Sequence, residues 1–379
     1  MSRLPGKKNK YDSDKEIEVK LDEVKNYDAD EAFKPYVASD KKPKKKKTAR
    51  KVILIILLIL FLLFAAVAVT FLVLRHTGKD MVSYDDAQIQ SIEGAVVEDN
   101  GKTVIYNGKT YRLNENIASI ACLGIDKENL GTYGDAIGTG GQADTVMVLA
   151  IDTKTGEVTV IAIPRDMMVD IDLYTVDGEY VGNKNTQLCL SYAYGDGKHT
   201  SCKNTVASIQ RVLFGMPVNS YISLDMAGIA PLNDSVGGVT VVPNETIGGF
   251  TAGEGVTLHG KNALTFVRER ADDTNASIRR MERQVTYIKA FGAKAVKSAV
   301  KDFSIISSLY KTAQQYCCTN VGLDNVTYLA STLLSKGIGE IRTVSVPGEM
   351  KMGDQHTEFY MDTTAAYEMI LDIYYDEVA

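Results

Sequence analysis

The sequence is poor in the residues that build zinc sites. It has five cysteines and four histidines in 379 residues, with no CxxC pair and no HExxH. Zinc sites need thiol and imidazole ligands at short, regular spacings, so neither a structural zinc module nor a zinc protease is indicated. The sequence also lacks GxSxG and the SxxK–SxN pair, which leaves serine acyl-enzyme chemistry without support.

Positive charge is scarce outside the N-terminal region. Residues 1–51 hold 16 basic and 10 acidic residues, a net charge of +6, and the whole chain carries −6. Residues 52–379 therefore carry −12. Phosphate backbones bind clustered positive charge, so an acidic body makes a poor nucleic-acid partner and disfavours a transcription regulator. The tail has few aromatic or β-branched residues and is predicted to be disordered.

Residues 52–74 form a run of 23 residues without a charge. About 20 apolar residues suffice to cross a bilayer, which predicts a transmembrane helix. A buried core helix and a cleaved signal peptide are the alternatives, but the run is longer than a signal and begins after fifty residues. Residues 41–51 carry eight Lys or Arg, so the positive-inside rule predicts a cytoplasmic tail and an extracellular C-terminal body.

The remaining chain alternates strand and helix patterns. Asn107-Gly108 lies between two alternating segments and predicts a β-hairpin. Strands are expected at 117–126, 145–152, 157–164, 218–224, 238–243 and 341–347, and the second and third should pair as an antiparallel hairpin. Helices are expected at 204–215, 225–238, 260–268, 276–299, 303–316, 322–336 and 361–375.

This order predicts an α/β domain, with a mixed central sheet between helices on both faces. The expected organisation is a tail at 1–51, a membrane helix at 52–74, a linker with a small hairpin at 75–116, and an extracellular domain at 117–379. The cysteines leave one question open. Cys189 and Cys202 could form a disulfide outside the cell, whereas Cys122 lies in an apolar run and reads as a buried small hydrophobe.

Two acids adjoin predicted strands. Asp126 ends one, and Asp144 begins the next after a loop of 17 residues. Carboxylates at neighbouring strand ends suit Mg²⁺, which prefers oxygen ligands and retains water or substrate phosphates. Two solvated loop acids are the alternative. After the third strand, Pro164 ends the ladder and places Arg165 and Asp166 at the sheet rim, either as part of a site or as a local salt bridge.

An arginine-rich segment follows at 266–284. Ile278, Met281, Val285 and Ile288 recur at helical spacing and predict the packing face, leaving a polar stripe on the other side. A solvated stripe is the ordinary reading. However, guanidinium groups match phosphate oxygens bidentately, and these arginines lie within an acidic domain. The polar residues on or beside this helix are Arg268, Arg270, Arg279, Arg280, Arg283, Gln284 and Tyr287.

Together, these clusters predict a polyanion site, with a pyrophosphate held by Mg²⁺ and arginines. The apolar anchor indicates a membrane-bound donor. Tyr192 and Tyr194 alternate before a glycine-rich turn, where they could flank a sugar or lipid, but core packing is the default for both.

Six motifs in this order resemble the LytR-CpsA-Psr family of Gram-positive cell-envelope proteins. They extend from about residue 117 to residue 295. The motifs are LGID (123–126), ADT (143–145), IPRD (163–166), YAYGDG (192–197), DSVGGV (234–239) and RER…RMERQ (268–284).

The resemblance implies a phosphotransferase that moves wall teichoic acid or capsular polysaccharide from undecaprenyl pyrophosphate to peptidoglycan, in an α-β-α sandwich. It implies that Asp126 and Asp144 hold the metal, that Arg165 binds pyrophosphate and that Asp166 is a candidate base. The C-terminal positions that would bind pyrophosphate are Arg268, Arg270, Arg280, Arg283 and Gln284. A polyprenyl-pyrophosphate hydrolase and a non-catalytic lipid or glycan receptor remain alternatives.

The sequence departs from the family pattern at three places. Many relatives have an arginine where this chain has Gln142-Ala143. A Lys-x-Asn pair aligns with Gln187 and Cys189, and an aspartate aligns with Ser277. The loss of two cations weakens the case for a phosphate site and could signal a different glycopolymer.

Overall fold

The computed structural model describes residues 45–84, 88–131, 138–175, 177–270, 276–302, 304–337, 339–354 and 356–378. The chain divides into two compact units, Met1–Leu63 and Phe64–Ala379. Of the tail predicted at residues 1–51, residues 1–44 lie outside the described residues.

Helix α1 (Lys45–Thr77) contains the predicted apolar run. Among the described residues, one helical stretch, Ile53–Val82, has the length and composition needed to cross a membrane. No residue in the most apolar part of this stretch is buried. A core helix would bury these side chains, so the core-helix alternative is wrong.

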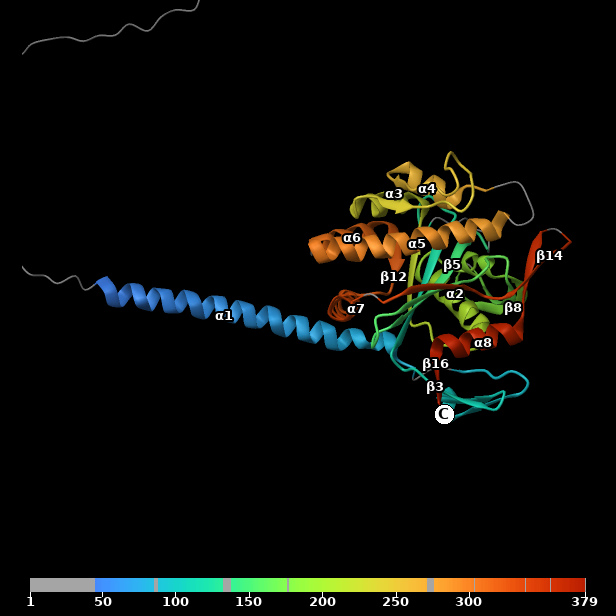
Figure 1. The fold of residues 1–379 in the computed structure, drawn as a ribbon, viewed down its shortest axis with the longest axis horizontal. Coiled ribbons are helices and arrows are strands. Elements are labelled where there is room, and N and C mark those ends of the chain that lie inside the picture. The colour runs from blue at the N-terminus through green and yellow to red at the C-terminus, as the bar shows by residue number, and fades with distance from the viewer. Residues whose placement is uncertain are drawn as a thin grey trace, which may run out of the picture. The chain divides into compact units, whose positions relative to one another are not determined.

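A six-stranded mixed sheet lies at the centre of the second unit (Figure 1). Its order is β12-β9-β4-β5-β6-β13, in which β4–β9 and β6–β13 are parallel and the other pairs antiparallel. The predicted hairpin of the second and third strands is the β5–β6 pair. The strands are Ile117–Ile125 (β4), Ala143–Asp152 (β5), Val158–Ala162 (β6), Ser220–Leu224 (β9), Cys317–Thr319 (β12) and Ile341–Ser345 (β13).

Helices cover both faces of this sheet. Ala121 of β4 belongs to an apolar cluster with α2 (His199–Val212) and α8 (Thr363–Tyr374). Its neighbour Ile120 packs on the other face, in a cluster with α7 (Leu323–Lys336). Because successive residues of a strand face opposite sides, β4 must be apolar at nearly every position. The predicted α-β-α sandwich is confirmed.

A second group of helices packs beside the sheet around its own apolar cluster, which includes Phe250, Phe266 and Tyr287. A short antiparallel pair, β10–β11, belongs to the same group. The elements are α3 (Met226–Ser235), β10 (Val239–Val241), β11 (Val256–Leu258), α4 (Lys261–Arg268), α5 (Ala276–Lys301) and α6 (Ser304–Tyr316). The predicted helices from 225 onward all match these or α7 and α8 within a few residues.

The predicted helix at 204–215 begins earlier than expected, at His199. Asp196 is the reason. Its Oδ1 accepts from the backbone N–H groups of Lys198, Thr200 and Ser201 at 2.8, 2.9 and 3.2 Å. A carboxylate that takes up these otherwise unpaired donors starts the helix one turn sooner.

A small four-stranded sheet, β1-β2-β3-β16, includes the predicted hairpin. Asn107 and Gly108 have φ of 50° and 75°, the left-handed conformation that a two-residue turn requires. The C-terminal strand β16 was not predicted; it pairs with β3, and both lie beside the C-terminus in Figure 1. The strands are Ala95–Glu98 (β1), Thr103–Tyr106 (β2), Lys109–Leu113 (β3) and Tyr375–Val378 (β16).

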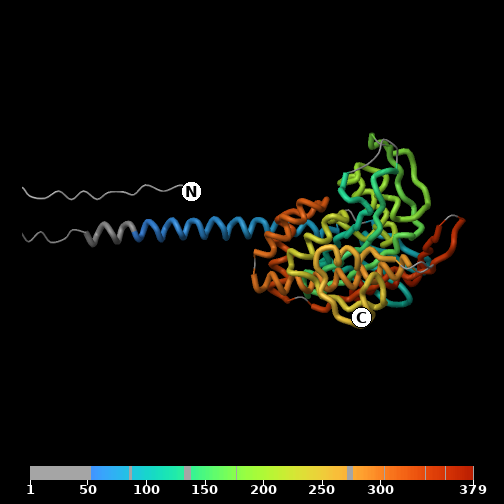
Figure 2. The backbone as a smooth tube through the Cα atoms, turned by 90° about the horizontal axis from the view of Figure 1, so that it is seen from above, coloured from blue at the N-terminus to red at the C-terminus, as the bar shows by residue number. Residues whose placement is uncertain are grey.

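Two further hairpins were missed by the sequence analysis. They are β7–β8 (Met168–Tyr174 and Tyr180–Gln187) and β14–β15 (Gly348–Met352 and Thr357–Met361). Figure 2 shows the first in yellow-green at the edge of the folded unit. Both begin or end beside Asp166, whose carbonyl accepts from the N–H of Phe359 at 2.8 Å. Short 3₁₀ turns occupy Gly78–Val82, Asp99–Gly101 and Leu188–Ala193.

Candidate functional site

The end of the β4–β5 hairpin brings two acids together. Ile125 pairs with Ala143 after a bulge. The N–H groups of Asp126 and Asp144 both donate to the carbonyl of Gln142, each at 3.1 Å. Both carboxylates therefore leave the same edge of the sheet, where the sequence placed them.

Arg165 and Asp166 follow β6 in a tight turn. The carbonyl of Pro164 accepts from the N–H of Met167 at 3.0 Å. Arg165 pairs with Asp144 through Nη1, and its Nε donates to Asp166 Oδ1 at 3.2 Å. The sequence left a local salt bridge and a site as alternatives; the structure contains the salt bridge, and a role of the pair in a site stays a prediction.

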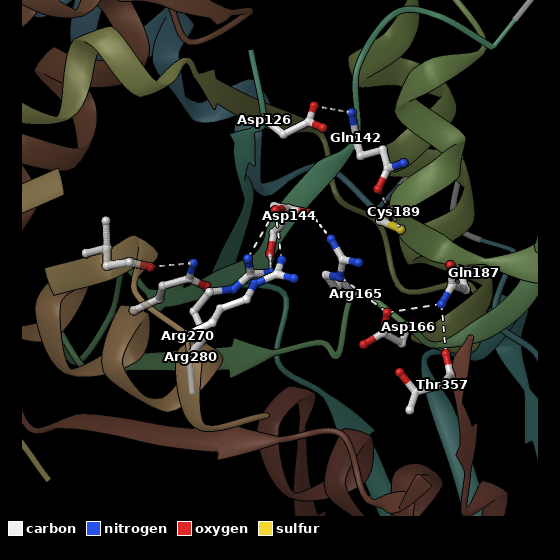
Figure 3. Close-up of polar contacts among 12 residues, drawn as sticks. Asp126, Gln142, Asp144, Arg165, Asp166, Gln187, Cys189, Arg270, Arg280 and Thr357 are labelled. Atoms are coloured by element: carbon white, nitrogen blue, oxygen red, sulfur yellow. Dashed lines mark hydrogen bonds and ion pairs between the residues drawn. The ribbon is translucent and has the colours of Figure 1, made fainter. Parts of the chain in front are cut away.

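Three guanidinium groups converge on Asp144 (Figure 3). Besides Arg165 on Oδ1, Arg270 lies 3.2 Å and Arg280 3.1 Å from Oδ2. Arg280 also donates to the backbone carbonyl of Asp144 at 3.2 Å. The cations come from the turn after β6, the segment after α4 and the first turns of α5. The fold thus gathers residues 165, 270 and 280 around one acid.

Burial and mutual repulsion act on these arginines. Burial disfavours the charge of Arg165, but Asp144 and Asp166 outweigh it and raise the pKa of Arg165 above its usual value. Burial lowers the pKa of Arg280 to about 10, and Arg270 and Arg165 add to the lowering. Among the described acids Arg270 and Arg280 pair only with Asp144, whereas Arg165 also binds Asp166, and a bound anion would reduce the repulsion among the three cations.

Asp166 is buried, with 2% of its surface exposed. Its Oδ1 accepts from Arg165 Nε and from Gln187 Nε2, the latter at 3.1 Å. Gln187 also donates to the carbonyl of Thr357 at 2.8 Å, which ties β8 to β15. No described residue donates a hydrogen bond to Oδ2. Of the two carboxylate oxygens of Asp166, the described side chains therefore hold only Oδ1.

The polar stripe of α5 faces inward, so the solvated reading is wrong. Arg280, Arg283 and Gln284 are 3%, 2% and 7% exposed. Their aliphatic stems pack, and their polar ends find acids and carbonyls. Val285 and Ile288, which were predicted to form the packing face, are only half-buried.

Arg283 lies in a different cluster from the three arginines on Asp144. It pairs with Glu245 and donates to the carbonyls of Phe266 and Glu269. Arg279 binds the other oxygen of Glu245 at 2.9 Å. This pair joins α5 to the loop after β10 and the end of α4.

Arg268 and Gln284 are the remaining two positions that were predicted to bind pyrophosphate. Arg268 ends α4, is exposed and has no ion pair with any described residue. Gln284 donates through Nε2 to the carbonyl of Val267 at 3.1 Å. It also lines a small pocket with the site residues and with apolar side chains. The lining comprises Asp144, Thr145, Val146, Ile163, Pro164, Arg165, Asp166, Ser277, Ile278, Met281 and Gln284.

All five cysteines are free thiols, so the Cys189–Cys202 disulfide is not formed. Cys189 packs against the site, and burial raises its pKa to about 12 although Arg165 opposes this. Cys202 instead points to Ser223 Oγ at 3.3 Å. Tyr192 is fully buried and donates to the carbonyl of Gly197 at 2.7 Å, which fits the core reading.

The sequence model of the LytR_cpsA_psr family matches residues 80–372. The chain belongs to the LytR-CpsA-Psr family. The resemblance that the motifs carried is confirmed, over a longer segment than 117–295.

Two relatives of this LytR-CpsA-Psr protein are polyisoprenyl-teichoic acid–peptidoglycan teichoic acid transferases TagU. The protein from Enterococcus faecalis is 26% identical over 64% of this chain and 73% of its own. The protein from Oceanobacillus iheyensis is 29% identical over 62% of this chain and 68% of its own. Both relatives are named as enzymes, which agrees with the enzymatic activity predicted from the motifs. The crystal structure of Bacillus subtilis TagV shares the fold, with a TM-score of 0.52 at 20% identity over 67% of this chain and 94% of that one.

The departures from the family pattern have structural roles in this LytR-CpsA-Psr domain. The N–H of Gln142 donates to Asp126 Oδ1 at 2.6 Å, and its side-chain oxygen faces the Cys189 thiol at 4.0 Å. Gln187 holds Asp166, as described above. Ser277 lines the small pocket. A neutral amide thus stands at each of the two positions; Gln187 contacts Asp166 with its side chain, whereas Gln142 contacts Asp126 only through its backbone N–H.

The donor set at residues 126 and 144 fits a divalent oxygen-seeking cation. Among the described residues, no group of three or more His, Cys, Asp or Glu side chains could hold a metal by itself. Mg²⁺ does not need one, because it is commonly held by one or two carboxylates together with phosphate oxygens and water. In this structure both oxygens of Asp144 accept from arginines. A metal ion bound by Asp144 would therefore compete with these arginines.

Some site residues had no signal in the sequence. Glu245 lies in a loop without a motif, and Thr357 contributes only its backbone carbonyl. Their roles depend on which elements the fold places next to each other. An acid inside a short loop opposite an arginine-rich helix is the only clue that could have pointed to Glu245.

Proposed function

We propose that this chain is a membrane-anchored extracellular phosphotransferase. It moves an anionic glycopolymer, of the teichoic acid or capsular polysaccharide type, from a polyprenyl-pyrophosphate carrier to peptidoglycan. The relatives named above carry that activity in their names. The observation that carries the proposal is the convergence of Arg165, Arg270 and Arg280 on the single carboxylate of Asp144.

The arginine cluster supports a pyrophosphate ligand. Each guanidinium presents several N–H donors in a plane, which matches the oxygens of a phosphate group. Arg270 is the most exposed of the three, with 43% of its side chain accessible. Arg165 and Arg280 are largely buried and held in place. A pyrophosphate that displaced Asp144 from these donors would meet positioned cations at little cost in ordering them.

Asp126 and Asp144 are the residues that would hold Mg²⁺. The ion would supply Lewis-acid neutralisation of the charge that develops on the leaving phosphate. If Asp144 held the ion, Arg165, Arg270 and Arg280 would be free to donate to pyrophosphate oxygens. The proposal therefore expects the cation and the pyrophosphate to bind better together than separately.

In the reaction, a hydroxyl oxygen of peptidoglycan bonds to the phosphorus attached to the glycopolymer. The bridging P–O bond breaks, and polyprenyl phosphate leaves with the electron pair. Asp166 takes the hydroxyl proton at Oδ2, because Oδ1 is anchored by Arg165 and Gln187. Phosphoryl transfer asks the protein mainly for in-line positioning and charge stabilisation, which the arginines provide.

The topology follows from the charge on either side of the membrane helix. The basic flank at residues 41–51 stays in the cytoplasm, and the part of the chain that follows the apolar run, from Arg75 onward, reaches the extracellular side. The carrier lipid and the peptidoglycan are then both accessible to the site.

The test uses the full-length chain in detergent with a polyprenyl-pyrophosphoryl saccharide, Mg²⁺ and peptidoglycan oligomers. Covalent saccharide on peptidoglycan is expected, and it should be lost in EDTA and in the Asp144→Ala and Arg165→Ala variants. Release of free saccharide phosphate without an adduct would show a hydrolase instead. Retained binding without turnover would show a receptor.

A further inference from the structure

The β7–β8 hairpin begins just after Asp166 and ends at Gln187, which lies across from Met168. The side chain of Gln187 donates to Asp166 Oδ1 and to the carbonyl of Thr357 (Figure 3). The proposed reaction brings an acceptor hydroxyl to Asp166, so the sugar that carries this hydroxyl must lie against a surface that adjoins Asp166. The hairpin provides such a surface.

The two faces of the hairpin differ in character. Successive residues of a strand point to opposite sides. On one side, Val169 packs against the main apolar cluster and Ile171 is fully buried. On the other side, Asp170 and its cross-strand partner Asn185 are exposed. The apolar side therefore fixes the hairpin to the domain, and the polar side is open to a ligand.

The polar side carries a row of amide groups along β8. Gln187, Asn185 and Asn183 alternate along the strand, so their side chains leave from the same face. Gln187 is buried, whereas Asn185 and Asn183 are exposed. Further along, Tyr180 pairs with Tyr174, and the centroids of the two rings are 5.6 Å apart. The row thus begins at the proposed proton acceptor and extends away from it.

Most of the hydrogen-bonding capacity of the two asparagines is unused. Asn185 Nδ2 donates to Asp170 Oδ1 at 2.9 Å. An amide has two N–H donors and an oxygen acceptor, so Asn185 keeps a donor and an acceptor for a ligand. The side-chain amide of Asn183 has no hydrogen-bond partner among the described residues. Sugar hydroxyl and acetamido groups donate and accept as well, and they are the complement of such amides.

Charge indicates which saccharide this face can take. Arg211 of α2 donates to both carboxylate oxygens of Asp172 at 2.9 and 2.8 Å, and to the carbonyl of Asp170 at 2.7 Å. The Asp172 charge is therefore paired, whereas the Asp170 carboxylate is exposed and has no cation among the described residues. A carboxylate repels an anionic polymer but not an uncharged sugar. The face therefore favours the uncharged sugar backbone of the acceptor over the anionic glycopolymer of the donor.

The neighbouring β14–β15 hairpin is less suited to this role, because its polar groups satisfy one another. Lys351 pairs with Glu349 and lies over the ring of Tyr360, 5.1 Å from its centroid. The Tyr360 hydroxyl donates to Glu358 at 2.6 Å.

We infer that the polar face of β7–β8 binds the glycan strand of the acceptor. Asn185 and Asn183 hydrogen-bond its hydroxyl and acetamido groups, and Tyr180, which is 57% exposed, packs its ring on the apolar face of a sugar. This inference rests on the proposed function and adds the path along which the acceptor reaches Asp166.

The experiment measures binding to the full-length chain in detergent by titration calorimetry. The main probe is chitotetraose, an uncharged tetramer of N-acetylglucosamine that resembles the sugar backbone of peptidoglycan. Asn183→Ala combined with Asn185→Ala should weaken its binding by about tenfold or more, since each lost hydrogen bond weakens binding about fivefold. Tyr180→Ala should weaken it about fivefold. Lys184→Ala, which lies between the two asparagines and faces the other side, should bind like the wild-type chain.

Two further probes separate this inference from the proposed function. Affinity for polyprenyl pyrophosphate with Mg²⁺ should be the same in all these chains, and so should any affinity for poly(glycerol phosphate), an anionic polymer. Chitotetraose binding that is unchanged in both test variants, or equally weakened in Lys184→Ala, would overturn the inference. A loss confined to poly(glycerol phosphate) would also overturn it, because the face would then bind the donor polymer.

The two proposals can fail independently. If the wild-type chain binds polyprenyl pyrophosphate but not chitotetraose, this inference is wrong and the donor site is unaffected. If chitotetraose binds through these residues but no saccharide is transferred, the proposed function is wrong and the glycan-binding face stands. Melting temperatures of all the variants should match that of the wild-type chain, because the substituted side chains are exposed.

Discussion

Arg280 on α5 places its guanidinium against Asp144 on β5, with Nη1 3.1 Å from Oδ2, while only 4% of the Arg280 side chain is exposed. This contact joins the arginine helix to the central sheet. Breaking a buried pair from one side leaves an uncompensated charge. We expect Asp144→Asn to lower the free energy of unfolding by roughly 2–4 kcal/mol, measured by urea denaturation.

A double variant checks that explanation. In Asp144→Asn combined with Arg280→Met, the orphaned charge is absent, and most of the lost stability should return. If the double variant is as unstable as the sum of the single ones, Asp144 stabilises the fold by some route other than Arg280.

Asp166→Asn tests the proton acceptor. The amide preserves the shape next to Arg165 but cannot take a proton, so kcat should fall by about 10²-fold or more with little change in substrate affinity. Single-turnover and binding measurements separate the two quantities. Weakened binding with kcat intact would instead make Asp166 a residue that only positions Arg165.

Arg270 and Arg283 were predicted to share a role, but the structure places them in different clusters. Arg270→Gln should weaken pyrophosphate binding by at least about tenfold without loss of stability, because Arg270 is half exposed. Arg283→Gln should lower stability by about 1–3 kcal/mol, because Glu245 and the carbonyls of Phe266 and Glu269 lose a buried donor while Arg279 still binds Glu245. Combining Arg283→Met with Glu245→Gln is the control, and it should recover stability. If Arg283→Gln weakened pyrophosphate binding under conditions in which the variant is fully folded, this division of roles would be contradicted.

Alkaline pH should destabilise the protein. Burial raises the pKa of Tyr374 to about 12, and burial raises the pKa of Cys122 to about 12. Their unfolded values lie near 10 and 8.5. Because the folded state holds these protons more tightly, the contribution is complete below pH 8.5 and is lost between about pH 9 and pH 12. The lowered pKa of Arg280 acts in the opposite direction, whereas the raised pKa of Cys189 adds to the decline.

Urea unfolding across this pH range provides the measurement. Tyr374→Phe should flatten the decline, at a cost of about 1 kcal/mol at neutral pH for the lost Ser119 hydrogen bond. Tyr180→Phe, which changes an exposed ring, should leave the profile as it is. An unchanged slope in Tyr374→Phe would refute the assignment.

The thiols provide a further check. Since all five cysteines are free, denaturation without reductant should expose five reactive thiols per chain. Peptide mapping after alkylation should find Cys189 and Cys202 both modified. Three reactive thiols would reveal a disulfide that the structure does not contain.

Local patterns determined much of this protein. The apolar run, the Asn107-Gly108 turn, the β5–β6 hairpin and the later helices all follow from side-chain periodicity and turn chemistry, which act between near neighbours in the chain. The sequence also placed Asp126 and Asp144 at neighbouring strand ends, but the β4–β5 pairing that brings them to one edge of the sheet was not predicted. The six ordered motifs also predicted the family.

Other features depended on which segments meet. Periodicity identified the two faces of α5 but could not say which one is buried, since burial of Arg280 and Arg283 depends on acids supplied by β5 and by the loop at Glu245. Sequence spacing likewise gave no reason to separate Arg283, which pairs with Glu245, from Arg270, which pairs with Asp144. Those distinctions arise only in the tertiary structure, where hydrogen-bond partners from distant segments decide which atoms are satisfied and which remain for a ligand.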